Sequence, residues 1–376
     1  MDNVNSLFEF LFPLNLIIDL VNSFFISALI LYICKKNNIS SNLSIILFAS
    51  CFTPFLFNGF LIDWTVFPDQ TKYIRRAAEM RNFDITEDNF NPKNLKLVMT
   101  KGIYMIFPVP FIEGFKSIGF ANRFALLILI IFLVKKNFDK YFILTLIFLP
   151  SIILYSSVSL RDSLIIVISI LFFHYFFEKN YTTSFLYLFL LFLIKFQNAI
   201  FFSIILILYS LFFNPKFSPT VVKKNLRDVF LLFITAVFIL YFNDIIELFN
   251  TRRYGMYDEE YGGGTGYIDL NLGNLSFIGL TSFIQFILSP IKSFDSIIGL
   301  LLIIDTIILY LIIYYFFSKI YSKNKKLSSF WFLALLGISF VYGLAIFNDG
   351  TIHRYKVVYV IPLIFALLKS SKIKNV

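Results

Sequence analysis

Long apolar runs, separated by short clusters of lysine and other polar residues, dominate this chain of 376 residues. A helix needs about 20 apolar residues to cross a bilayer, and shorter helices are tolerated where the chain bends. By that measure the pattern predicts about eleven membrane-spanning or membrane-dipping helices. They are 7–34, 43–62, 117–134, 141–158, 163–177, 182–196, 198–213, 227–249, 294–318, 329–347 and 355–369. We therefore expect an all-α, polytopic integral membrane bundle that forms one transmembrane domain over residues 1–376.

Two apolar stretches do not fit a simple span. The run 182–213 is interrupted around Lys195, beside Gln197 and Asn198, so it is either a hairpin of two short helices or one tilted helix. These polar residues either cap two short helices or line a cavity. The stretch 275–290 is also apolar, and the topology beyond it changes if it crosses the membrane.

Basic residues in the short loops set the expected orientation, because Lys and Arg accumulate on the cytoplasmic side of a membrane. With the N-terminus outside, all lysine-rich short loops and the C-terminal tail fall inside. We expect a multi-pass protein of the cytoplasmic membrane, with its C-terminus in the cytoplasm and 7–34 as a retained first span. Two long outer loops remain, 63–116 and 250–293, and we expect short re-entrant or interfacial helices in both.

Composition supports the membrane assignment. Hydrophobic residues make up 58% of the chain, whereas soluble domains contain about 45–50%. The net charge of +10 is explained by the basic inner loops, so we expect no nucleic-acid partner. Two cysteines cannot build a disulfide framework or a cysteine-based metal site.

Several charged residues at the expected outer boundary are candidates for a functional site. A charge near membrane depth is unfavourable unless it pairs or lines a cavity, which makes such residues functional candidates. These candidates are Asp69, Arg161, Asp162, Lys195, His353, Arg354 and Lys356. Asp19 and Asp305 are intramembrane carboxylates that could form a proton relay, although neither has an obvious partner in the sequence.

Each candidate also has a structural interpretation. Arg161 and Asp162 stand between two apolar runs with almost no loop, so they either close a tight turn as a pair or present the arginine to an anionic ligand. Arg354 and Lys356 either extend to the membrane surface or bind a ligand. Asp69 follows the second span, where it is either a solvated carboxylate or a group that orients or deprotonates a sugar hydroxyl.

Three segments carry short polar motifs, at residues 149–162 (LPSIILYSSVSLRD), 348–356 (NDGTIHRYK) and 68–73 (PDQTKY). They resemble motifs of the Wzy/EpsG-like oligosaccharide repeat-unit polymerases, and the first resembles the family's "PS…(W/Y)SS…(R/K)D" segment. Residues 348–356 (NDGTIHRYK) resemble its late outer loop, with Lys356 in place of the second arginine. Residues 68–73 (PDQTKY) resemble an early element shared with other membrane glycosyltransferases. Family members often carry Arg-Pro where this chain has Lys195-Phe196, which leaves the role of that position open.

The resemblance implies a glycosyltransferase that uses oligosaccharides linked through diphosphate to a polyprenyl lipid. Arg161, Lys195, Arg354 and Lys356 would bind the leaving diphosphate, because cations stabilise the charge that develops there. Asp69 or His353 would activate the acceptor hydroxyl. No metal or other cofactor is implied. Expected partners are the lipid-linked oligosaccharide, membrane lipids and a chain-length regulator.

Three other functions fit parts of the pattern. A GT-C-type enzyme would add a single sugar from a polyprenyl-phosphate donor, with Asp69 as the acid or base. A transporter or flippase of lipid-linked glycans would carry charges along a path through the bilayer, often with inverted repeats, whereas these charges gather at one face. A purely structural membrane subunit is the fourth interpretation. The product distinguishes the polymerase from the GT-C-type enzyme, since the polymerase makes a ladder of repeat units and the GT-C-type enzyme adds one sugar.

Overall fold

The computed structural model describes residues 2–58, 61, 70, 73, 102, 107–111, 116–213, 240–257, 269–271, 273–289, 297–346 and 349–373. Every regular element within these ranges is a helix, which confirms the all-α prediction. The chain divides into two compact units, Met1–Phe196 and Gln197–Val376. Compact units need not be separate domains, so the single transmembrane domain stays a prediction.

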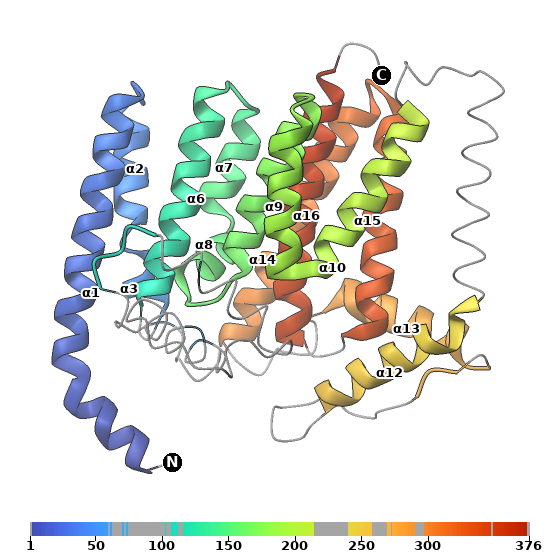
Figure 1. Cartoon of the computed structure of the whole chain (residues 1–376), viewed down its shortest axis with the longest axis horizontal. Helices are drawn as coiled ribbons and strands as arrows, with labels where there is room; N and C mark the ends of the chain where they lie inside the picture. The colour runs from blue at the N-terminus through green and yellow to red at the C-terminus, as the bar shows by residue number, and fades with distance from the viewer. Residues whose placement is uncertain are drawn as a thin grey trace. The chain divides into compact units, whose positions relative to one another are not determined.

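The first unit contains seven described helices and the beginning of an eighth. They are α1 (Asp2–Lys36), α2 (Ser41–Ser50), α3 (Thr53–Phe57), α6 (Ser117–Lys135), α7 (Lys140–Phe148), α8 (Pro150–Ser157), α9 (Asp162–Phe177) and the start of α10 (Tyr181–Phe213). The turns that follow α1, α6 and α9 lie at the same end of this unit (Figure 1). Lysine lies at each of these helix ends or in the turn that follows, as the expected topology requires of loops on one side of a membrane.

The second unit contains the rest of α10 and five more described helices. These are α12 (Phe242–Tyr257), α13 (Leu275–Leu288), α14 (Ile297–Tyr321), α15 (Lys325–Ala345) and α16 (Asp349–Ser371). Helices α12 and α13 lie across the direction of α15, at the end of the unit opposite the α14–α15 turn (Figure 1). Within this unit α13 packs on α15, and α14, α15 and α16 contact one another.

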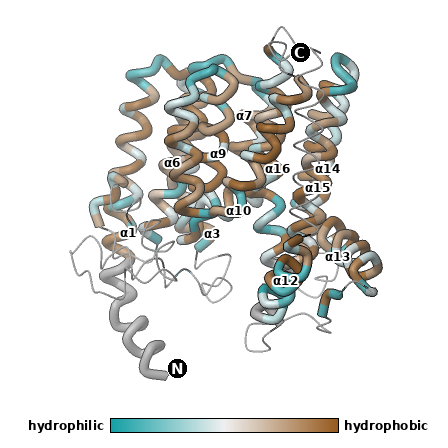
Figure 2. Tube along the Cα trace, turned by 45° about the vertical axis from the view of Figure 1, so that its right-hand side comes forward, coloured by the Kyte–Doolittle hydropathy of each residue, from teal (hydrophilic) through white to brown (hydrophobic). Residues whose placement is uncertain are grey.

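Six helices in the described ranges are long and apolar enough to cross a membrane. They are Leu16–Lys36, Ser117–Lys135, Tyr181–Phe213, Gly299–Tyr321, Lys325–Ala345 and Gly350–Ser371. A seventh is added if α7 and α8, which meet at a bend of 54°, form one broken span. The helices are hydrophobic along most of their length, with hydrophilic residues toward their ends (Figure 2). The protein is therefore a helical multi-pass membrane protein.

Of the eleven predicted membrane-spanning or membrane-dipping helices, not all are confirmed as spans, because several of the segments form shorter helices. Residues 43–62 form α2 and α3 as far as they are described, and α9 has only 16 residues. The stretch 275–290, which is not one of the eleven, forms α13 with 14 residues, and at about 1.5 Å per residue this is too short for a hydrocarbon core of about 30 Å. Of the predicted span 227–249, the residues up to 239 lie outside the described ranges, and the end belongs to α12.

Two backbone breaks have local causes. Helix α7 ends before Pro150, and Leu149 has an extended backbone (φ −65°, ψ 120°), as expected for the residue before a proline. Inside α10, Lys195 has a non-helical backbone (φ −149°, ψ 78°), so the polar interruption in this apolar run does divide it into two helical segments. The boundary between the two units follows directly, after Phe196.

Candidate functional site

The segment that joins α8 to α9 is buried although its backbone is not helical. Its polar backbone groups therefore need partners from elsewhere. The side chain of Asn122 on α6 donates to the carbonyl of Val158, at 3.1 Å, and to that of Leu160. The amide of Ser159 donates to Oε1 of Gln70 at 2.8 Å. These bonds hold the connection in one conformation inside the apolar unit.

Close packing of α6 against α8 brings Asn122 within reach of this segment. Gly119 lies one turn before Asn122, and a Cβ atom at this position would collide with the carbonyl of Ser157. The absence of a side chain thus lets the two backbones approach. Gln70 is held in turn by Nδ2 of Asn58, which donates to its Oε1 at 2.9 Å.

Arg161 connects this segment to the break in α10. Its Nη1 donates to the carbonyl of Ile194 at 2.8 Å. A helix carbonyl normally accepts from an amide four residues later, and the non-helical backbone of Lys195 lies within that turn. Lys195 itself is buried, at 5% exposure, whereas Arg161 is half-buried. Two cationic residues therefore lie at two adjoining backbone breaks of the first unit.

Asp162 follows Arg161 as the first residue of α9. A carboxylate in the first turn of a helix interacts favourably with the helix dipole. Its side chain is buried, at 2% exposure, and takes part in further interactions. The predicted residues Arg161, Asp162 and Lys195 thus belong to one region of the first unit. Asp69, the fourth predicted residue of this unit, lies outside the described residues.

The other predicted residues lie early in α16, in the second unit. His353 is fully buried, and its Nε2 is 2.9 Å from Oδ2 of Asp305 on α14. Arg354 is half-buried, with its guanidinium 5.5 Å from the ring centre of Tyr355. His353 and Lys356 are three residues apart, so they share one face of the helix.

Lys356 binds the carbonyls at the C-terminal end of α13. Its Nζ donates to the carbonyls of Ile287 and Ser289, both at 2.7 Å, and it lies over the rings of Phe286 and Tyr310. The carbonyls at a helix C-terminus lack helical partners, and a cation there also interacts favourably with the helix dipole. The ammonium of Lys356 therefore joins α13 to α16, a contact that the sequence did not indicate.

Sequence reasoning did not find the contacts that support the predicted residues within each unit. Asn122 and Gln70 hold the α8–α9 connection, and Asp305 pairs with His353. Asp305 carried a sequence signal, since a carboxylate inside an apolar run requires a partner, and Gln70 lies within the motif-like segment 68–73. The other intramembrane carboxylate, Asp19, is 3.4 Å from Nζ of Lys116.

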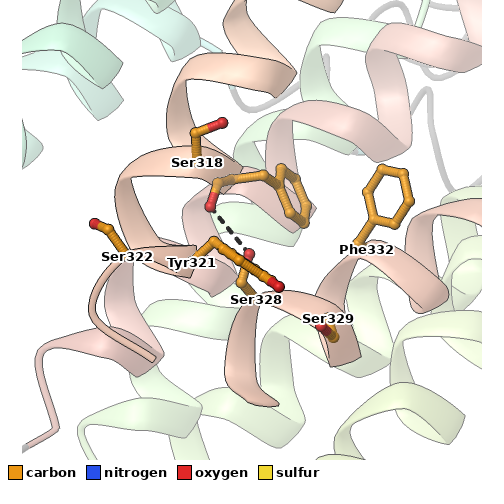
Figure 3. Close-up of a pocket in the computed structure, with 7 residues that line it drawn as sticks. Ser318, Tyr321, Ser322, Ser328, Ser329 and Phe332 are labelled. Atoms are coloured by element: carbon orange, nitrogen blue, oxygen red, sulfur yellow. Dashed lines mark hydrogen bonds between the residues drawn. The ribbon is translucent and has the colours of Figure 1, made fainter. Parts of the chain in front are cut away.

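A pocket of about 280 Å³ lies at the turn between α14 and α15 (Figure 3). Its walls combine serine hydroxyls with the rings of Phe317, Tyr321 and Phe332. Ser328, at its base, donates to the carbonyl of Phe317 at 3.0 Å. None of the predicted site residues that the structure describes lines this pocket.

No protein-family model, curated protein or solved structure matches this chain. The class of protein stated above, a helical multi-pass membrane protein, thus comes from its own fold and sequence. The resemblance to repeat-unit polymerases stays a prediction.

Proposed function

We propose that this chain is a membrane glycosyltransferase that polymerises lipid-diphosphate-linked oligosaccharide repeat units on the outer face of the cytoplasmic membrane. The observation that supports this most is the position of Arg161 and Lys195, at adjoining backbone breaks within an apolar unit. Cationic side chains are costly in such surroundings unless they serve a ligand or a pairing role. The two residues are suited to an anionic group, and a diphosphate is such a group.

The chemistry of the reaction explains why cations are needed. An acceptor hydroxyl displaces the diphosphate from an anomeric carbon, and negative charge develops on the leaving oxygen. Arg161 can offer paired hydrogen bonds to phosphate oxygens, and Lys195 a point charge. Cations that are already in place stabilise this charge without reorganisation during the reaction.

The residues of α16 have different parts in the proposal. Arg354 is half-buried and supplies a further cation for the diphosphate. Lys356 is held by two carbonyls, so it would have to exchange those bonds to contact a ligand. We therefore keep Arg161 and Lys195 of the first unit and, independently, Arg354 of the second as candidates for the diphosphate, with Lys356 as a secondary candidate. His353 or Asp69 activates the acceptor hydroxyl.

Deletion of the protein in its host, with the surface glycan resolved on a gel, tests the proposal. Collapse of a ladder to single repeat units supports a polymerase. A glycan shortened by one sugar identifies the single-sugar transferase instead, and an unchanged glycan contradicts both enzymes and favours transport or a structural role.

Variants of Arg161 in the complemented deletion strain sharpen this test. Arg161→Ala should abolish the ladder, and Arg161→Lys should restore it only in part, because lysine keeps the charge but not the paired hydrogen bonds. Lys136→Ala, an exposed cation after α6, is the control and should leave the ladder unchanged. Full activity of correctly inserted Arg161→Ala protein would refute the proposal.

A further inference from the structure

Asp305 and His353 have the arrangement of a base held by a carboxylate. Nε2 of His353 is 2.9 Å from Oδ2 of Asp305, and the side chains of His353 and Asp305 are 0% and 2% exposed. Asp305 comes from α14 and His353 from α16, so packing of these two helices creates the pair. Neither residue is a helix cap, so completion of a helix end does not explain it.

The carboxylate decides which ring nitrogen carries the proton. An ionised carboxylate only accepts hydrogen bonds, so Nε2 must donate to Asp305. In a neutral imidazole the lone pair is then on Nδ1. A carboxylate in this position also stabilises the imidazolium that forms when the ring takes up a proton.

We propose that Asp305 is a positioning residue for His353, which is the general base of the transfer; this rests on the proposed function. The proton of the acceptor hydroxyl moves to Nδ1 of His353 as the acceptor oxygen bonds to the anomeric carbon. The bond from that carbon to the diphosphate oxygen breaks, and the diphosphate leaves with the electron pair. Asp305 keeps the ring oriented and stabilises its positive charge.

This assignment selects His353 over Asp69 as the base. Since His353 is fully buried, the acceptor hydroxyl reaches Nδ1 only when it displaces the groups that cover the ring. Catalytic hydrogen bonds often form only once the substrate is bound, so a covered ring is compatible with this role.

The protonation state can be measured without any activity assay. The chain has only two histidines, so ¹⁵N-histidine labelling of the full protein in phosphatidylethanolamine–phosphatidylglycerol vesicles gives two imidazole signal sets. The set lost in His353→Gln belongs to His353. The proposal requires a neutral ring with its proton on Nε2 at pH 7. A proton on Nδ1 alone, or on both nitrogens, overturns it.

Measurement of glycan polymerisation then shows whether Asp305 acts in catalysis or only in helix packing. Asp305→Asn keeps the size and an acceptor oxygen but removes the charge, so glycan polymerisation should fall roughly 10- to 100-fold while the protein stays folded. Asp305→Glu should recover part of that loss. The control is Asp244→Asn, an exposed carboxylate on α12, which should keep wild-type activity at equal protein level.

The outcomes distinguish the two proposals. If deletion or Arg161→Ala removes the ladder but Asp305→Asn has wild-type activity, the positioning role is refuted and the proposed function stands. If deletion leaves the glycan unchanged, the proposed function fails, and the role of the pair in it fails with it.

Discussion

Nε2 of His353 and Oδ2 of Asp305 meet at 2.9 Å inside the second unit, although the two residues are 48 positions apart in the chain. Each would be a poor choice alone in an apolar helix, because an unpaired polar group in the membrane costs free energy. Together they satisfy each other. The pair therefore accounts for an intramembrane carboxylate that had no evident partner in the sequence.

Replacement of both members of this pair should lower the free energy of unfolding by less than the two single replacements added together. Asp305→Leu leaves the buried Nε2–H of His353 without this acceptor, and we expect a loss of about 1–3 kcal/mol in the free energy of unfolding. The double variant Asp305→Leu/His353→Phe should lose clearly less than the sum of the single variants, since neither member of this hydrogen bond is left without the other. Unfolding of purified protein in detergent measures all three. Additive losses would show that the pair is not coupled.

Lys356 should contribute to stability through α13. Lys356→Met keeps most of the side-chain volume but removes the bonds to the carbonyls of Ile287 and Ser289. Hydrogen bonds to charged groups contribute about 1.5–3 kcal/mol each, so we expect a loss of at least about 2 kcal/mol and faster proteolysis near α13. Lys323→Met, at an exposed position, is the control and should change stability by less than about 0.5 kcal/mol. Equal stability of the two variants would contradict this role.

Two glycines should respond to alanine in opposite ways. Gly119→Ala places a methyl group against the Ser157 backbone, and overpacking of this kind costs about 1–3 kcal/mol. Gly337, which is also helical, is the matched control, because a Cβ added there would meet no neighbouring atom within 4 Å. Alanine at Gly337 should be neutral or stabilise by up to about 1 kcal/mol, because it restricts the unfolded chain. Thermal unfolding of the two variants measures both effects. A stabilised Gly119→Ala would show that α6 and α8 are not closely packed.

The helices could be predicted because their signal is local. Apolar runs such as 117–134 and 294–318 are sufficient to predict α6 and α14 to within a few residues at each end. Polar interruptions also marked the break at Lys195 and the connection around Arg161 correctly. The number of spans could not be predicted in the same way, because a short apolar run such as 275–290 has the same composition whether it crosses the membrane or lies across other helices, as α13 does.

The sequence alone determined that this protein is helical, that it is a multi-pass membrane protein and that a few cations interrupt its apolar runs. Only the tertiary structure decided which polar groups meet: Asn122 with the α8–α9 connection, Lys356 with the end of α13, and Asp305 with His353. The reason is physical. Hydrophobicity acts on each segment through its own residues, whereas these hydrogen bonds depend on how helices distant in the chain pack against one another.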